Sequence, residues 1–305
     1  MIGTFMQIVE KAKEGGAKKR AAIPLLKEQD LNLLQRLAEE GFIVPLLIGN
    51  AKETEIIVGK APLASLEYEI VDVKDSAEAL RTAVAFTREG RADILMQGGV
   101  DQKSFMGAVL KKETGLMKGK LASYVSVLQA QKSERLILVT DTFVNDMPGI
   151  VEKQIIIENA LVLAGILGMK EPKIAAIAAI EQVNPNIQST VDAAVLSKMS
   201  ERKQFGKAII EGPLDMDCAL SRVAAARKGI ESIVTGNVDV YVVPEIETGY
   251  LLVQALVFFG RMKTAGILLG TAKPVIPNMP FISDENRVVE LALAALISRR
   301  EADNA

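Results

Sequence analysis

The sequence contains no histidine and no tryptophan, and it has a single cysteine, Cys218. Without histidine, the chain lacks the usual general base at neutral pH and the commonest side-chain ligand of transition metals. One cysteine excludes an internal disulfide bond and a zinc cluster. We therefore expect Cys218 to be a buried thiol. We also expect Asp, Glu, Lys, Tyr or the bound substrate to carry any proton transfer.

Several sequence patterns are missing as well. The chain has no P-loop, no dinucleotide-binding glycine pattern after its first expected strand, and no Gly-x-Ser-x-Gly elbow. No apolar run reaches the roughly 18 residues of a membrane span, and residues 11–20 are polar and basic, which is unlike a secretory signal. A formal net charge of −2 with mixed signs argues against a general binder of nucleic acid or anionic membranes. These observations indicate a cytoplasmic protein without nucleic-acid or membrane partners.

The residues that are present favour an α/β fold. Apolar residues make up 49% of the 305 positions and aromatic residues only 4%, so the core must consist of Ala, Val, Ile, Leu and Met. Short apolar segments alternate with amphipathic helical segments, and glycine-rich turns join them. This alternation predicts parallel or mixed sheets flanked by helices. The pattern restarts after residues 145–149, which we interpret as the clearest linker.

The stretch 266–287 is the most informative local sequence. It begins as a buried strand over residues 266–269, and a loop with Pro274, Pro277 and Pro280 follows. Because proline fixes φ and lacks an N–H donor, we expect this loop to be neither helix nor central strand. Ser283 is placed to cap the last helix. A stiff loop between a strand and a capped helix is a common place for a site.

Glycines, hydroxyls and helix starts follow six of the expected strands. We expect these turns to converge on one sheet edge, where free amides can bind phosphate. Each glycine taken alone is equally a turn residue. The carboxylates that follow the later strands can bind a metal, or they can cap helices and lie in solvated loops, and we expect Asp217 to cap a helix that reaches about Lys228. The loop lysines can hold phosphate or be solvated. These side chains are Asp215, Asp217, Glu245 and Glu247, and Lys118 and Lys120.

Six blocks of the chain resemble the phosphate acetyl/butyryltransferase family in order and spacing. The butyryl-type branch is the most similar, through Glu181-Gln182-Val183-Asn184-Pro185 and Thr190-Val191-Asp192-Ala193-Ala194. Several blocks in register are more specific than one short motif. The blocks cover residues 93–120, 140–145, 181–198, 212–221, 244–249 and 270–274.

The resemblance implies a two-domain, isocitrate/isopropylmalate dehydrogenase-like fold and a homodimer. The first α/β domain would comprise residues 1–146 plus 277–305, the second residues 147–276, and an active-site cleft would lie between them. The implied reaction converts acyl-CoA and phosphate into acyl phosphate and CoA. It requires no cofactor and no metal, since CoA or acyl-CoA is a substrate.

The resemblance also implies functional residues. Catalytic roles fall on Asp284, which aligns with an acid of the acetyl-type branch, and on Glu181 and Asn184. Substrate contacts are expected from turns and loops in both halves of the chain, namely Gln97, Gly98, Lys118, Thr140, Asp141, Gly212, Pro213, Asp217, Glu245, Gly249, Lys273, Met279 and Pro280.

Some positions depart from the family pattern. Met279-Pro280 stands where relatives carry a Ser-Arg pair, Gln97 where they carry a lysine, and Met117 where they often carry an arginine. Phosphate binding then falls to other cations, namely Lys103, Lys118, Lys120, Lys273 or Arg287. The departures keep two alternatives open. One is an impaired family member that binds CoA or a related ligand as a regulatory or interaction protein. The other is a different reaction on an acyl-CoA or phosphate-bearing substrate.

Overall fold

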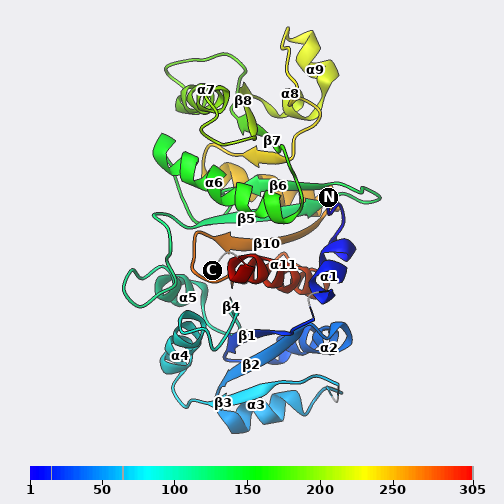
Figure 1. The fold of residues 1–305 in the computed structure, drawn as a ribbon, viewed down its shortest axis with the longest axis vertical. Coiled ribbons are helices and arrows are strands. Elements are labelled where there is room, and N and C mark those ends of the chain that lie inside the picture. Colours follow the sequence, from blue (N-terminus) through cyan, green and yellow to red (C-terminus); the bar gives the residue numbers. More distant parts are fainter. Residues whose placement is uncertain (15, 64, 304–305) are drawn as a thin grey trace. The chain divides into compact units, whose positions relative to one another are not determined.

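The computed structural model describes residues 1–14, 16–63 and 65–303, and the chain forms two compact units. The first unit comprises Phe5–Ala122 and Ala265–Ala305, and the second comprises Met1–Thr4 and Ser123–Thr264 (Figure 1). The chain crosses between the units after Thr4, Ala122 and Thr264, and the last two crossings occur earlier than the expected boundaries after residues 146 and 276. The reason is strand pairing: residues 123–140 form two strands that pair with each other, and the second of them pairs with a strand at residues 240–242.

The first unit is built on a mostly parallel sheet with the strand order β3-β2-β1-β4-β11-β10. All neighbouring strands run parallel except β10 and β11, which form an antiparallel hairpin. These strands are β1 (Lys19–Pro24), β2 (Ile43–Gly49), β3 (Glu69–Asp72), β4 (Ile94–Met96), β10 (Lys263–Leu269) and β11 (Val275–Ile276).

The last helix is the central helix of the first unit. Residues 288–297 are buried all round this helix, including Glu290, whose carboxylate accepts the N–H of Gly266 in β10 at 3.1 Å. Among the residues the structure describes, no helix combines the length and the apolar character that crossing a membrane requires. The helices of this unit are α1 (Phe5–Lys13), the 3-10 helix η1 (Glu28–Asp30), α2 (Leu31–Glu40), α3 (Ala51–Val58), α4 (Ser76–Arg88), α5 (Gln102–Val109) and α11 (Asp284–Asp303).

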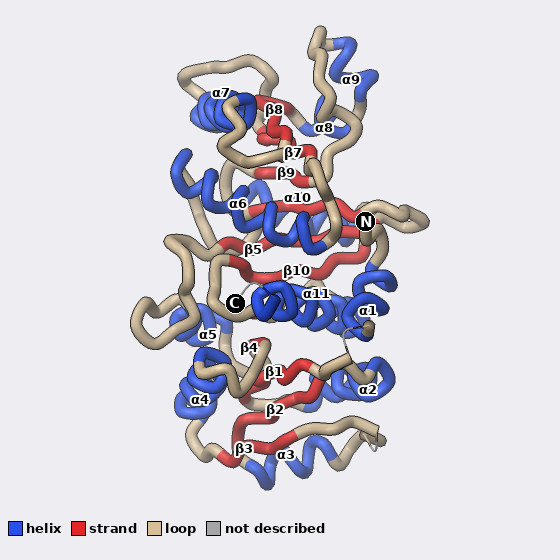
Figure 2. Tube along the Cα trace, in the orientation of Figure 1, coloured by secondary structure: helices blue, strands red, loops and turns tan. Residues whose placement is uncertain are grey.

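The second unit has a mixed sheet with the strand order β5-β6-β9-β7-β8. β5 runs antiparallel to β6, whereas β6, β9, β7 and β8 all run parallel to one another. Figure 2 shows strands and helices alternating along both units, which confirms the predicted α/β class. These strands are β5 (Ser123–Gln129), β6 (Leu136–Thr140), β7 (Lys173–Ile177), β8 (Ile209–Leu214) and β9 (Val240–Val242).

The segment expected to be one helix from Asp217 to Lys228 is two short helices instead. Ser221 has extended backbone angles, and its hydroxyl accepts the N–H of Ala224, so the first helix stops and a second begins there. The cap of the first helix is Asp215, not Asp217. The helices of this unit are α6 (Ile150–Ile166), α7 (Gln188–Glu201), α8 (Met216–Leu220), α9 (Arg222–Arg227) and α10 (Ile246–Phe258).

The proline-rich loop contains a central strand, which the sequence analysis excluded. β11 lies between β4 and β10, with Pro274 and Pro277 on either side of it. The carbonyl oxygens of Pro274 and Ile276 accept N–H groups of Leu95 and Gln97, each at 3.0 Å. Proline lacks a donor but keeps its acceptor, so two residues between prolines can join a sheet when the neighbouring strand supplies the N–H groups.

A buried ion pair fixes the start of α11 within the first unit. The guanidinium of Arg287 donates to a carboxylate oxygen of Asp30 at 3.0 Å, and both side chains are almost fully buried. The other oxygen of Asp30 accepts the N–H of Lys27 at 3.0 Å. Arg287 is therefore held by an internal carboxylate, which argues against its expected use as a replacement phosphate ligand.

Removing one member of this pair should strongly destabilise the protein. Arg287→Met leaves the Asp30 carboxylate buried without its cation, which costs about 3–5 kcal/mol, and chemical denaturation measures the loss. The double variant Asp30→Leu with Arg287→Met removes both charges and should recover much of this stability. A double variant less stable than Arg287→Met would contradict the assigned pairing.

Candidate functional site

The polar turns of the second unit meet at one edge of its sheet. Because β6, β9, β7 and β8 run parallel, the segments after them lie together at the carboxyl edge. The predicted convergence is confirmed for these four turns. The predicted site residues of this unit lie in or shortly after these strands, namely Thr140, Asp141, Glu181, Asn184, Gly212, Pro213, Asp217, Glu245 and Gly249.

The other two turns belong to the first unit and lie at different ends of its sheet. The turn that starts at Gln97 follows β4 and lies at the carboxyl edge. The turn over residues 270–273 joins β10 to β11, and it lies at the opposite edge because β10 is antiparallel to β11. The prediction of one shared edge is therefore wrong for residues 270–273.

Asp141 organises the turn after β6. Its buried carboxylate is surrounded by N–H donors. The preceding residue, Thr140, is engaged elsewhere, because its hydroxyl donates to the carbonyl of Tyr124 at 3.2 Å. Burial raises the pKa of Asp141, and the N–H donors oppose this shift by stabilising the charged form. The carboxylate shapes the turn through the backbone N–H groups of Tyr124, Phe143, Val144 and Asn145 and the side-chain amide of Asn145.

The start of α10 packs closely on this turn. A Cβ at Gly249 would lie only 2.7 Å from the carbonyl oxygen of Asp141, so only glycine allows this approach. Glu245 is the N-cap residue of α10, and one of its carboxylate oxygens lies 3.5 Å from the hydroxyl of Thr248. Gly249 therefore positions α10, and Glu245 marks the point where this helix reaches the carboxyl edge.

Lys228, just after α9, is the centre of a charged cluster. Its ammonium group contacts the carboxylates of Glu181, Asp215 and Asp217, the last at 2.8 Å. These contacts join the segment after β7 to both ends of the α8–α9 region. Two predicted site residues, Glu181 and Asp217, are thus held by a lysine that the sequence analysis did not single out.

The cluster changes the proton affinity of its members. The hydrogen bond from Lys228 lowers the pKa of Glu181 to about 2, and the carboxylates, Asp215 first, raise the pKa of Lys228. Glu181 is therefore fully ionised at neutral pH and is a weak proton acceptor. Its geometry suits a structural anchor better than a general base.

Cys218 lies beside this cluster as the expected buried thiol. Its sulfur lies 3.8 Å from a carboxylate oxygen of Glu181, and burial raises the pKa of the thiol to about 12. The potential ligand atoms of Glu181, Asp215, Asp217 and Cys218 lie within 4.8 Å of one another. This arrangement resembles a cation site, but the ammonium group of Lys228 already supplies the positive charge.

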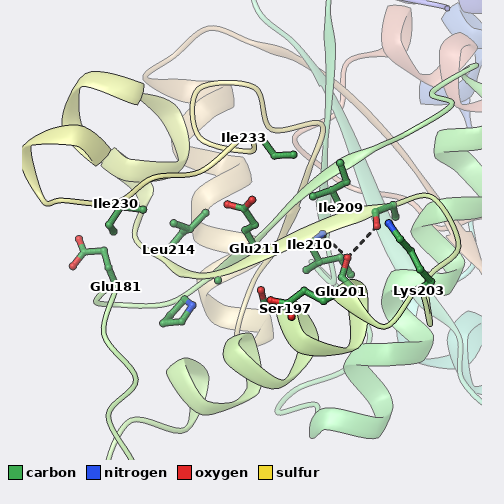
Figure 3. Close-up of a pocket in the computed structure, with 14 residues that line it drawn as sticks. Glu181, Ser197, Glu201, Lys203, Ile209, Ile210, Glu211, Leu214, Ile230 and Ile233 are labelled. Atoms are coloured by element: carbon green, nitrogen blue, oxygen red, sulfur yellow. Dashed lines mark hydrogen bonds between the residues drawn. The ribbon is translucent and has the colours of Figure 1, made fainter.

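A cavity of about 520 Å³ lies along the edge strand β8 (Figure 3). Gly212 and Pro213 line it, as does Glu181, and Figure 3 shows Glu201, Glu211 and Lys203 around the same space. Its three carboxylates outnumber its one lysine. The negative charge makes this cavity a poor host for phosphate, so Gly212 and Pro213 face an environment unlike the predicted one.

A larger cavity, of about 700 Å³, lies at the carboxyl edge between the first turns of α6, α7 and α10. Lys153 and Asp192 form a buried ion pair in its wall, with 2.6 Å between the ammonium nitrogen and the nearer carboxylate oxygen. The other oxygen of Asp192 accepts the side-chain amide of Gln188 at 2.8 Å. Glu245 is the predicted site residue that lines this cavity.

Asn184 lies in a separate turn before α7. Its backbone N–H donates to the hydroxyl of Thr190 at 2.9 Å, and that hydroxyl donates to the carbonyl of Ile187 at 2.8 Å. The side-chain oxygen of Asn184 accepts the N–H of Asn186 at 3.0 Å. These bonds give Asn184 a turn-forming role, and its predicted catalytic role remains a prediction.

Gln97 connects two loops of the first unit. Its buried amide donates to the carbonyl of Val100 at 2.8 Å and accepts the N–H of Asn278 at 2.7 Å. The next residue, Gly98, has φ 59°, and a Cβ there would lie 2.0 Å from the carbonyl oxygen of Pro24. Gln97 therefore positions the loop that leads to Met279, and Gly98 is the residue that the turn requires.

The loop after β11 presents one buried and one exposed apolar residue. The side chain of Met279 is buried and its carbonyl accepts the N–H of Ile282, whereas Pro280 is exposed. Asp284 begins α11, is partly exposed, and accepts the side-chain amide of Asn32 at 3.3 Å. Asp284 is therefore the residue of this loop that can accept a proton.

Lys118 and Lys273 lie on adjoining segments. The N–H groups of Lys118 and Gly119 both donate to the carbonyl oxygen of Gly270, three residues before Lys273. Met117 forms a β-bridge with Thr271 next to this contact. In this antiparallel pairing Lys118 lies opposite Gly270, and Lys273 lies three residues further along the second segment.

Three functional residues were not predicted from the sequence, namely Lys153, Gln188 and Lys228. Lys153 carried a signal, since it precedes Ile156, Ile157 and Ala160 on the buried face of α6, where a lysine is unusual. Lys228 carried none, because it follows a short helix and its carboxylate partners come from other segments. Only the folded chain brings these charges together.

The charged cluster should make stability depend on both Lys228 and pH. Glu181 has a folded-state pKa below its ordinary 4.5, so its ionised form stabilises the fold above about pH 4.5, and this contribution disappears as the pH falls toward 2. Lys228→Met should lower the Tm at pH 7, and its difference from the unmodified protein should narrow between about pH 4.5 and 3. Lys207→Met, at an exposed lysine of the same unit, is the control. A difference that stays constant with pH would contradict this account.

Comparison with known proteins gives a consistent result. The family model described as phosphate acetyl/butaryl transferase matches residues 74–295. The phosphate butyryltransferase of Clostridium beijerinckii is 37% identical over 300 residues, which is 98% of this chain and 99% of that protein. A branched-chain phosphotransacylase from Enterococcus faecalis V583 has a TM-score of 0.79 at 26% identity, over 92% of this chain and 99% of that one.

A more distant structure shares the fold alone. The 4-hydroxythreonine-4-phosphate dehydrogenase of Klebsiella pneumoniae has a TM-score of 0.56 at 14% identity, over 92% of this chain and 100% of that one. This likeness agrees with the expected dehydrogenase-like α/β architecture. With a family match over most of its length and a relative 37% identical from end to end, the chain belongs to the phosphate acetyl/butaryl transferase family.

Proposed function

We propose that this protein is a phosphate acyltransferase that moves a short acyl group between CoA and inorganic phosphate. The observation that carries the proposal is the 37% identity with a phosphate butyryltransferase over 98% of this chain. The similarity therefore extends over both units of the chain. None of the comparisons favours the alternative of an impaired binding protein.

The reaction makes definite physical demands. An oxygen of phosphate attacks the thioester carbon, the C–S bond breaks, and the CoA thiolate leaves and takes up a proton. Holding phosphate against the thioester lowers the barrier by fixing the reactants, and donors must stabilise the oxyanion that forms on the carbonyl. No step changes an oxidation state, and the proposal includes no cofactor and no metal. CoA and phosphate are substrates.

The three proposed catalytic residues differ in what their surroundings allow. Asp284 is partly exposed and has one long hydrogen bond to Asn32 at 3.3 Å, so it is the best placed to accept a proton. Glu181 is held ionised by Lys228, and Asn184 is engaged in its own turn. We assign the acid–base role to Asp284, and positioning roles to Glu181 and Asn184.

Phosphate binding cannot follow the family pattern at Met279-Pro280, because neither side chain is charged. In the proposal Lys103 replaces that charge, because α5 begins at Gln102, just after the Gln97 turn, at the same edge of the sheet as the loop that carries Met279. A lysine ammonium group at this edge suits a phosphate dianion. Lys118 and Lys273 lie at the opposite edge, so their contact with phosphate stays a prediction. Arg287 is not among the proposed ligands, since it is paired with Asp30.

The proposal also includes a homodimer in the cytoplasm. Exposed apolar residues lie on and just after α10, with exposed fractions of 65% for Leu251, 64% for Phe258 and 90% for Phe259. Leu251 and Phe258 are seven residues apart and so share one helix face. Apolar side chains this exposed are typical of a surface that a partner covers. The cytoplasmic location rests on the sequence patterns described in the sequence analysis.

The enzymatic proposal is tested by release of CoA from acetyl-, butyryl- and isobutyryl-CoA in the presence of phosphate. We expect turnover with at least one of these thioesters, and unchanged turnover after treatment with EDTA. No turnover above background with any of them would contradict the proposal. That result would favour the alternative of an impaired family member that binds CoA or a related ligand.

The same assay tests the phosphate ligands. Because a hydrogen bond to a charged group contributes about 1.5–3 kcal/mol, Lys103→Met should raise the KM for phosphate roughly tenfold or more. The KM for acyl-CoA should change little. Lys112→Met, at an exposed lysine of the same unit, is the matched control and should behave like the unmodified enzyme.

The dimer proposal is tested by light scattering after size-exclusion chromatography. The expected mass is about twice 32.8 kDa, and Phe258→Asp should shift it toward the monomer by placing a charge in the apolar interface. Ile56→Asp changes a similarly exposed apolar residue of α3 and should leave the mass unchanged. A monomeric unmodified protein would exclude the homodimer.

A further inference from the structure

The larger cavity of the second unit has an apolar open surface. Eight of its described lining positions carry apolar side chains or proline, among them Ile177 at the end of β7, Ala178 after it, and Met216 at the start of α8. Its volume of about 700 Å³ lies within the range of sites for small molecules, roughly 300–1,000 Å³. The cavity is therefore large enough for a small ligand and has the surface of an apolar site.

The polar groups of this cavity do not suit an anion. Lys153 is its one cation among the described lining residues, and Asp192 neutralises it at 2.6 Å. The second oxygen of Asp192 is occupied by the amide of Gln188 at 2.8 Å. Glu245 then leaves the wall with a net negative charge. A phosphate group would be repelled here, whereas a neutral apolar group would replace water against methyl and methylene groups.

We propose that this cavity, hereafter the acyl cavity, takes the acyl end of the acyl-CoA, and that Ala178 and Met216 set the chain length. This inference rests on the proposed acyl transfer and adds the substrate end that the second unit recognises. The buried pair of Lys153 and Asp192 has a positioning role. It joins α6 to α7 in the wall of the cavity, and the two charges neutralise each other. The lysine is not a ligand of the substrate.

Ala178 and Met216 suit a role in selecting chain length. Ala178 is held by a hydrogen bond from its N–H to the carbonyl of Leu214 at 2.9 Å, so a longer side chain there must extend from a fixed backbone. Met216 has three rotatable side-chain bonds and a polarizable sulfur, and it adapts to ligands of different size. Both residues line the cavity, so the size of each side chain limits the space left for the acyl chain.

Substitution at these positions should change the preference among acyl chains. Burying one methylene group contributes about fourfold to binding, so the two additional methylene groups of butyryl-CoA should favour it over acetyl-CoA by up to roughly fifteenfold. Ala178→Leu should abolish most of this preference in kcat/KM, with little change in the KM for phosphate. Met216→Ala should move the preference toward hexanoyl-CoA.

Controls keep the outcomes distinct. Ala226→Leu makes the same change at an exposed position of α9 and should leave the ratios unchanged, and thermal unfolding confirms that each variant is folded. If the unmodified enzyme transfers acyl groups but both cavity variants keep its chain-length ratios, the acyl cavity is wrong and the proposed function stands.

A binding experiment decides the case in which no turnover occurs. Calorimetry without phosphate compares butyryl-CoA with CoA, and we expect the unmodified protein to bind butyryl-CoA more tightly. Ala178→Leu should reduce that difference. Equal affinities of the unmodified protein for the two ligands would overturn the acyl cavity, whereas a difference that Ala178→Leu removes would support it even if the protein proved inactive.

Discussion

The parallel pairing of β6, β9, β7 and β8 is the constraint on which the candidate site of the second unit depends. Parallel strands require crossovers, and the crossover helices begin where the strands end. The first turns of α6, α7 and α10 therefore gather at one edge and line the acyl cavity. The close approach of Gly249 to the carbonyl oxygen of Asp141 shows how little room this arrangement leaves. The strand topology therefore creates the site, and the polar turns after the strands are the feature of the sequence that predicts it.

The sequence predicted the elements well because their signals are local. Apolar segments, glycine turns and caps lie within a few residues of the structure that they determine, as the cap at Ser283 illustrates, whose hydroxyl accepts the N–H of Asn286. The errors arose where a distant partner decides the outcome. β11 exists because β4 supplies N–H donors to the carbonyls of Pro274 and Ile276, and the unit boundaries depend on pairing between β6 and β9. Neither partner is visible within a short window of sequence.

The same reason explains which parts of the candidate site were predicted. The turns were found, but the charges that decide their chemistry come from other segments. Lys228 changes Glu181 from a candidate base into an ionised anchor, and Lys153 is neutralised by Asp192. Arg287 is likewise held by Asp30. These three cations could each be taken for a phosphate ligand from the sequence alone. Because each is bound to an internal carboxylate, phosphate binding is restricted to other lysines.

The departures from the family pattern in the first unit are physically connected. Gln97 accepts the N–H of Asn278, the residue immediately before Met279. A lysine at position 97, as in relatives, has donors but no acceptor and could not make this bond. The glutamine therefore fits the present course of the loop, and the loop in turn carries Met279 and Pro280 in place of the Ser-Arg pair. These changes are best understood as one rearrangement of a single hydrogen-bonded unit. An attempt to restore the family pattern at residues 279 and 280 alone would leave Gln97 holding the loop in its present conformation, so the substitution at position 97 has to be made together with the other two.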